Sequence, residues 1–156
     1  MLTQIAILLF VSMLPVIELR GGIPMGLAMG LDFWTVYPVC VVGNLLPVPV
    51  LIPFAGRVLR WCATWPHVGF IFQKIMDIGY NKIGQMKSHY LWWGLFIFVA
   101  IPLPGTGAWT GSLIATLLQL ELRKSFPAIA LGVMASGIIM GILSFGVAGL
   151  FGMLAG

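Results

Sequence analysis

Two ionisable residues, Glu18 and Arg20, lie within an otherwise apolar stretch near the N-terminus. Charged side chains are costly in hydrocarbon, so inside such a stretch they usually face a cavity, a partner or a substrate path. On a regular helix, residues two apart diverge, whereas on extended or turning backbone they can point the same way. The pair therefore has two interpretations: a buried ion pair that only holds the backbone in place, or a site that binds a ligand.

As a binding site, the pair is suited to an anion and a proton. The planar guanidinium of Arg20 can contact two oxygens of a phosphate at once. Glu18, removed from water beside a cation, experiences opposed effects on its protonation. Such a carboxylate is suited to exchanging its proton when it changes partner between conformational states.

Proline and glycine interrupt the apolar sequence at residues 14–24 and again at 102–107. Irregular backbone at membrane depth is tolerated only where protein or water covers it. We expect Pro24 to open the returning helix of the first break and Thr106 to cap that of the second. Both helix N-termini would then add positive potential to an anion site. Asn44, within a later apolar run, either makes a helix–helix hydrogen bond or lines the cavity. The candidate binding residues are Glu18, Arg20, Gly21, Gly22, Pro24, Asn44, Pro104, Gly105, Thr106, Gly107 and Trp109.

The composition is that of a membrane protein. Hydrophobic residues make up 60% of the 156 residues and charged residues only 8%, against about 25% charged in an average soluble domain. The eight Lys and Arg residues are dispersed and not interleaved with aromatic residues, so we predict no nucleic-acid partner. We expect an all-α integral protein of the cell membrane that is in contact with membrane lipid.

The sequence also argues against an enzyme. Hydrolysis needs a nucleophile with a base, paired carboxylates or metal ligands. Besides Glu18, the carboxylates are Asp32, Asp77 and Glu121, all placed near water, and both histidines lie away from the breaks. The two cysteines have no metal-binding or redox spacing. We predict no catalytic residue, no metal ligand and no cofactor.

The lengths of the apolar runs predict the elements that position these residues. Runs 2–13 and 91–101 would form helices of roughly 18 Å, about half of a hydrocarbon core of about 30 Å. Each is expected to enter the membrane, turn at its break and return as a re-entrant helical hairpin. A long apolar run, kinked by prolines, follows each hairpin. We predict a single membrane domain, 1–156, made of unit 1 (1–55, with hairpin 2–30 and span 33–54), linker 56–89 and unit 2 (90–156, with hairpin 91–119 and span 126–154).

The two units resemble each other in sequence. Shifting the chain so that Pro15 falls on Pro104 aligns further glycines, prolines and one acidic position without a gap. Internal repeats of this kind are typical of membrane transporters. The other aligned pairs are Leu14 with Leu103, Gly22 with Gly111, Leu31 with Leu120, Asp32 with Glu121, Pro38 with Pro127, and Gly43 with Gly132.

The placement of charge predicts the orientation. If both hairpins re-enter and both long runs cross, linker 56–89 and loop 121–124 share one face, which carries every Lys and Arg except Arg20. The positive-inside rule makes that face cytoplasmic and both termini extracytoplasmic. The two units then form an inverted repeat, as in alternating-access carriers. Within the linker, apolar residues from Phe72 to Tyr90 recur at helical spacing, which predicts an amphipathic helix on the membrane surface.

Two motifs carry a resemblance to a known family. They are Glu18-Leu19-Arg20-Gly21-Gly22-Ile23-Pro24 and Ile101-Pro102-Leu103-Pro104-Gly105-Thr106-Gly107-Ala108-Trp109-Thr110-Gly111. With them the chain resembles, over essentially its whole length, the putative small multidrug export family. That family is similar in plan to the broader DedA-like group, which has paired re-entrant hairpins. Members of that group are associated with translocation of lipid phosphates such as undecaprenyl phosphate, with proton coupling. The resemblance implies this architecture and the importance of Glu18 and Arg20. The chain departs from the DedA pattern in being shorter and in having no acid or arginine in its second break.

Together these features predict a proton-coupled membrane transporter or flippase. It would move an anionic lipid-phosphate or amphiphilic substrate through a midplane site at the hairpin tips. Two alternatives stay open: a proton-driven exporter of cationic drugs, against which Arg20 beside Glu18 argues, and a non-transporting membrane scaffold. The thin wall that these segments make around a cavity is compatible with a homodimer.

Overall fold

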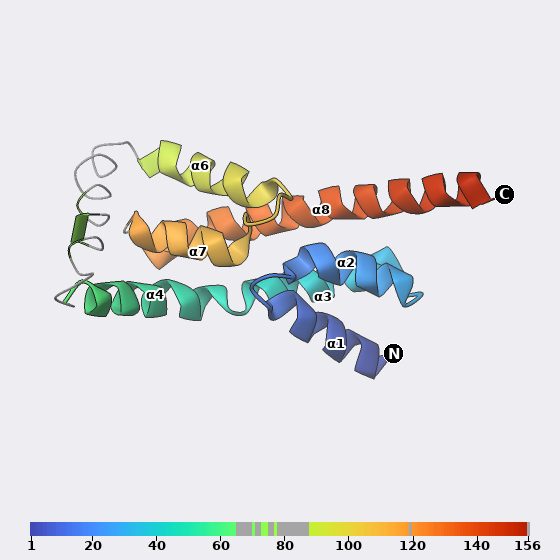
Figure 1. Ribbon diagram of the computed structural model, residues 1–156, viewed down its shortest axis with the longest axis horizontal. Helices are drawn as coiled ribbons and strands as arrows, with labels where there is room; N and C mark the ends of the chain where they lie inside the picture. The colour runs from blue at the N-terminus through green and yellow to red at the C-terminus, as the bar shows by residue number, and fades with distance from the viewer. Residues whose placement is uncertain (65–69, 71–72, 75–76, 78–87, 119, 156) are drawn as a thin grey trace.

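All regular structure in the described part of the chain is helical, as predicted. The computed structural model describes residues 1–64, 70, 73–74, 77, 88–118 and 120–155. Most of the predicted linker helix from Phe72 to Tyr90 lies outside the described residues. The helices, arranged as an elongated bundle in Figure 1, are α1 (Leu2–Met13), α2 (Glu18–Ala28), α3 (Phe33–Leu45), α4 (Val48–Cys62), α6 (Ser88–Ala100), α7 (Ala108–Leu117) and α8 (Leu122–Ala155).

The first break is shorter than predicted. α1 ends at Met13, where Pro15 follows closely, and α2 already begins at Glu18. Pro24 therefore lies inside α2, and its predicted place at the first helical position is wrong. A proline within a helix leaves the carbonyl four residues earlier, here that of Arg20, without its helical N–H partner. Membrane helices tolerate this loss because neighbouring groups re-satisfy the freed backbone.

The α3–α4 segment forms a first run long enough to cross a membrane. Asp32 caps α3, since its carboxylate accepts hydrogen bonds from the Thr35 backbone N–H at 3.0 Å and the Thr35 hydroxyl at 2.8 Å. The helix is interrupted only at Leu46 and Pro47, and α4 then continues past the predicted end of the span at residue 54. The described stretch Phe33–Val58 has 26 residues of suitable length and hydropathy.

The second half of the chain ends in one long helix. α8 has 34 residues, which at 1.5 Å per residue is about 51 Å. It begins at Leu122, ahead of the predicted start at residue 126, and its stretch Leu122–Val147 is the second candidate membrane span. Pro127 is accommodated within it. The C-terminal part of α8 continues well past α6 and α7 (Figure 1).

Glycines allow close helix contacts in both halves. A Cβ on Gly43 of α3 would lie 2.7 Å from the carbonyl oxygen of Leu9 in α1. A Cβ on Gly132 of α8 would lie 2.9 Å from the carbonyl oxygen of Phe96 in α6. Because backbone cannot move aside as a side chain can, both positions need a residue without a Cβ. These two glycines are one of the pairs that the sequence alignment matched.

Helices from the two halves interlock. α4 lies beside α7, while α2 and α3 lie against α8 (Figure 1). Fully buried side chains from both halves, among them Ile23, Val36, Val99 and Ile129, form one core. Because α2 and α7 each start at a break, this packing brings the two breaks together.

Candidate functional site

Hydrogen bonds join the two breaks directly. The indole N–H of Trp109 donates to the carbonyl oxygen of Met13 at 3.0 Å, and the backbone N–H of Trp109 donates to Oε1 of Glu18 at 3.3 Å. From the first break, Nη2 of Arg20 donates to the Thr106 hydroxyl at 2.7 Å and to the Ile101 carbonyl at 3.3 Å. Both predicted charged residues of the first break thus contact the second.

The Glu18 carboxylate caps α7 from the other half of the chain. The N-cap residue of α7 is Gly107, which offers no side chain, and Trp109 is at the second helical position. A side-chain oxygen that accepts from this N–H is the usual N-cap interaction, and a negative charge there also complements the helix dipole. A Cβ at Gly107 would overlap the carboxylate, so glycine makes room for Glu18.

The prediction that Thr106 caps α7 is wrong. Its hydroxyl lies 2.6 Å from the Ile101 carbonyl and 2.9 Å from the Leu103 carbonyl, while it accepts the hydrogen bond from Arg20. Thr106 therefore links Arg20 to the second break rather than to the helix that follows it.

Arg20 retains binding capacity that no protein group uses. Its described hydrogen-bond acceptors, Thr106 Oγ1 and the Ile101 carbonyl, are neutral oxygens. Its Nε is buried and has no hydrogen-bond partner. A guanidinium held in this way keeps both its charge and a donor for a ligand.

Glu18 and Arg20 do not form a direct ion pair. Among the described residues, the ion pair within 4.0 Å joins Lys124 and Glu121 at 3.4 Å. Both Glu18 and Arg20 lie in the first turn of α2, where side chains two residues apart diverge. The structure therefore does not support the interpretation of Glu18 and Arg20 as a direct, buried ion pair.

Asn44 is buried beside this site. It stands next to the Glu18 carboxylate and is 1% exposed. Its amide nitrogen and oxygen nevertheless do not reach hydrogen-bonding geometry with any described partner. Asn44 does not line the cavity between the breaks; its contact is with another helix, through the Glu18 carboxylate at the start of α2.

A cavity of about 540 Å³, here called the break cavity, opens between the two breaks. Six of the predicted residues line it: Glu18, Arg20, Gly21, Pro104, Gly105 and Thr106. The other predicted residues lie outside its lining: Gly22 faces Ser12 and Cys40, Gly107 lies under Glu18, Trp109 links the breaks, and Pro24 faces a second cavity. Met140 of α8 also lines the break cavity and was not predicted, since a methionine in an apolar helix carries no distinguishing signal.

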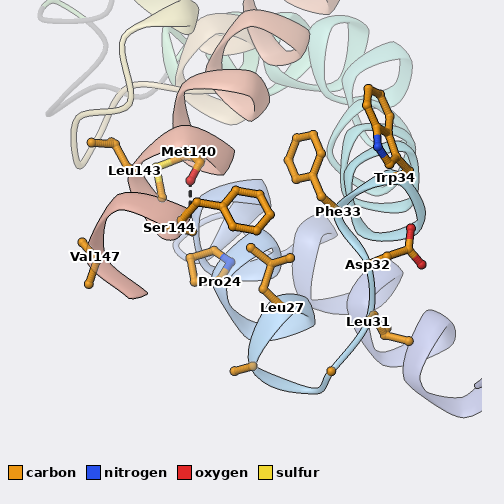
Figure 2. Close-up of a pocket in the computed structure, with 13 residues that line it drawn as sticks. Pro24, Leu27, Leu31, Asp32, Phe33, Trp34, Met140, Leu143, Ser144 and Val147 are labelled. Carbon is orange, nitrogen blue, oxygen red and sulfur yellow. Dashed lines mark hydrogen bonds between the residues drawn. The ribbon is translucent and has the colours of Figure 1, made fainter. Parts of the chain in front are cut away.

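The second cavity, here called the outer groove, is larger and apolar. It has a volume of about 900 Å³ and lies between α2, the start of α3 and the second half of α8. Figure 2 shows Pro24 and Leu27 facing Leu143 and Val147, with Phe33 and Trp34 at one side. The groove holds one carboxylate, that of Asp32.

The profile of the family described as "Putative small multi-drug export protein" matches residues 18–139. The match covers most of the chain, from Glu18 onward, and includes Arg20 and the whole second break. Comparison with curated proteins and with solved structures found no match. Together with the two long apolar helices, the family match indicates a membrane protein.

Proposed function

Because the chain belongs to this small multidrug export family, we propose that it is a proton-coupled transporter or flippase for an anionic lipid-phosphate or amphiphilic substrate. One observation carries the proposal. Arg20 faces the break cavity with a free buried donor and with only neutral oxygens as its described hydrogen-bond acceptors. A planar guanidinium in this state is suited to two oxygens of a phosphate or another oxyanion.

The position of Glu18 supports proton coupling, because its carboxylate occupies a helix N-terminus where an anionic ligand could bind. Helix N-termini bind phosphate and carboxylate through free backbone N–H groups, and Glu18 fills this position at the start of α7. Protonation of Glu18 would remove its charge and weaken its hydrogen bond with the Trp109 N–H. The site would then be more positive, and the N-terminus of α7 would be more available to a ligand. Proton binding and anion binding would therefore favour each other.

The helix lengths support re-entrant hairpins. α1 and α2 have 12 and 11 residues and α6 and α7 have 13 and 10, each too short for a hydrocarbon core of about 30 Å. The matched contacts of Gly43 and Gly132 support the repeat. In this arrangement both breaks lie near the midplane, the termini are extracytoplasmic, and residues 56–89 and 121–124 are cytoplasmic. Membership of the broader DedA-like group is part of the same proposal, because it depends on the paired re-entrant hairpins.

Reconstituted vesicles provide the test. Movement of a short-chain polyprenyl phosphate and of a quaternary ammonium dye would be measured with and without a proton gradient. We expect gradient-dependent movement of the phosphate in wild type, its loss in Arg20→Ala, and its retention in Lys124→Ala. Lys124 is the matched control because it is an exposed cation paired with Glu121.

The same assay separates the alternatives. Dye movement that survives Arg20→Ala but fails in Glu18→Gln would contradict the anion proposal and favour an exporter of cationic drugs. Drug export is the activity that the family description names. No movement of either compound by protein that is shown to be folded would favour a membrane scaffold.

A further inference from the structure

The break cavity and the outer groove share one lining residue. Met140 of α8 lines both of them. Figure 2 shows Met140 at the end of the outer groove, where its carbonyl oxygen accepts a hydrogen bond of 2.7 Å from the Ser144 hydroxyl. Movement of this one side chain would therefore change the connection between the cavities.

Two helix faces run from one cavity into the other. On α2, Arg20 lines the break cavity, whereas Pro24 and Leu27 line the outer groove. Positions separated by three and four residues share one helix face, so this face leads from the charged site to the apolar groove. On α8, Met140 is followed at the same spacing by Leu143, Ser144 and Val147, which line the groove.

The two cavities differ in chemistry in a way that orients an amphiphile. The break cavity contains the guanidinium of Arg20 and the carboxyl group of Glu18, whose protonation the proposed function couples to anion binding, whereas the outer groove has aromatic and aliphatic walls. The carboxylate of the groove belongs to Asp32, whose pKa is lowered chiefly by the hydrogen bond from the Thr35 side chain, so it is ionised at neutral pH. Asp32 repels an anionic group, while Arg20 attracts it. The volume of the groove is in the range that holds ligands of drug size.

We propose that the outer groove takes the apolar chain of the substrate while its anionic headgroup binds at Arg20, and that Met140 controls passage of the chain between the two cavities. This inference rests on the proposed function. Methionine suits the role because it is unbranched and adapts to irregular space. The backbone that carries it is held by close contacts, since Gly137 packs against Tyr37 and Gly141 against Phe33.

The test compares two phosphates with the same headgroup, butyl phosphate and hexadecyl phosphate, in reconstituted vesicles. Met140→Trp should lower movement of hexadecyl phosphate by about ten-fold or more, which is within the discrimination that an apolar pocket gives. Movement of butyl phosphate should fall several-fold less, because Met140 also lines the break cavity but the short chain does not need to pass it into the outer groove. Met140→Leu, which conserves volume, should affect neither compound strongly. Equal losses for both compounds, or no loss for either, would overturn the assignment.

Thiol labelling gives a reading that does not depend on transport. In a Cys62→Ser background, where Cys40 is buried, Leu143→Cys, which lines the outer groove and not the break cavity, should be protected from a maleimide by hexadecyl phosphate and not by butyl phosphate. Equal protection by both would contradict a groove for the chain. Failure of the proposed function is distinguishable, because Arg20→Ala would then leave movement of both phosphates unchanged whatever residue stands at position 140.

Discussion

At the residue scale, Glu18 joins the two breaks under local strain. Its φ of 49° is left-handed, which is uncommon for a residue other than glycine. Such conformations persist where the surroundings over-determine them, often at functional sites. Here the surroundings are the N–H of Trp109, the bare backbone of Gly107 and the buried amide of Asn44. The same residue therefore stabilises the contact between the breaks and places a charge at the cavity.

Gly107→Ala should destabilise the protein more than Gly105→Ala. Both glycines have positive φ, 153° and 86°, and an alanine in such a conformation is strained by about 1–3 kcal/mol. Only at position 107 would the new methyl also meet the Glu18 carboxylate, since a Cβ at Gly105 has no heavy atom within 4 Å. We expect the lower unfolding temperature in detergent for Gly107→Ala. Similar shifts for both variants would mean that the carboxylate does not sit over Gly107.

Two replacements of Glu18 should separate its role as a cap from its role as a charge. Gln keeps an oxygen that can accept from the Trp109 N–H, whereas Ala removes it at a cost of about 0.5–2 kcal/mol, as at other N-caps. We expect Glu18→Gln to unfold near the wild-type temperature but to lose proton-dependent transport, and Glu18→Ala to lose both. Wild-type pH dependence of transport in Glu18→Gln would refute the coupling role.

At the scale of elements, the sequence predicts the helices better than their ends. Pro15 marks the end of α1 correctly because a proline disfavours helix at the residue before it. The prediction for Pro24 is wrong because proline is common at helix starts, whereas a membrane helix tolerates a proline in its interior. The prediction for Thr106 is wrong because its hydrogen-bond partner, Arg20, comes from the other half of the chain. Met140 could not be found, since only tertiary packing sets it between two cavities.

Alanine at the close helix contacts should separate the helices. Gly43→Ala and Gly132→Ala would each place a methyl group within 3 Å of a backbone carbonyl oxygen, and overpacking of this kind typically costs about 1–3 kcal/mol. Gly94 and Gly146 are matched controls within α6 and α8, because a Cβ there meets nothing within 4 Å. We expect lower unfolding temperatures for the first two alanines and unchanged or higher ones for the controls. The reverse order would argue against these helix contacts.

The cap of α3 should make stability depend on pH. The pKa of Asp32 lies below its ordinary value of 3.8, chiefly because the Thr35 side chain donates to the carboxylate. A pKa lowered by folding means that the ionised form stabilises the fold. This contribution is full above that ordinary value and is lost as pH falls through the folded pKa. The difference in unfolding temperature between wild type and Asp32→Ala should therefore shrink on acidification.

Asp32→Asn provides the control for this effect. Asparagine also caps helices well but does not titrate in this range. The difference in unfolding temperature between Asp32→Asn and Asp32→Ala should stay constant as pH falls. If that difference shrinks in parallel with the wild-type one, the pH dependence comes from another group.

At the scale of the whole molecule, the proposed transport would use the outer groove and the break cavity as two stages of one path. The groove lies at the start of α3, and the break cavity lies where α2 and α7 begin. Met140 stands between them, near the middle of α8. If the start of α3 is extracytoplasmic, the path runs from that face toward the midplane. The direction of the proposed path therefore depends on the orientation of the chain in the membrane, which can be measured without any substrate.

The orientation predicts that the two ends of the α3–α4 run are labelled from opposite sides. Trp34, which is 81% exposed, stands at the first end of the run, and Arg60 stands in the last turn of α4, at the second end. In a Cys62→Ser background, an impermeant maleimide should label Trp34→Cys in right-side-out vesicles and Arg60→Cys in inside-out vesicles. The positive-inside rule predicts this result, because the expected topology puts every Lys and Arg except Arg20 on one side. Labelling of both cysteines from one side would mean that the α3–α4 run does not cross, and the inverted repeat would then fail with it.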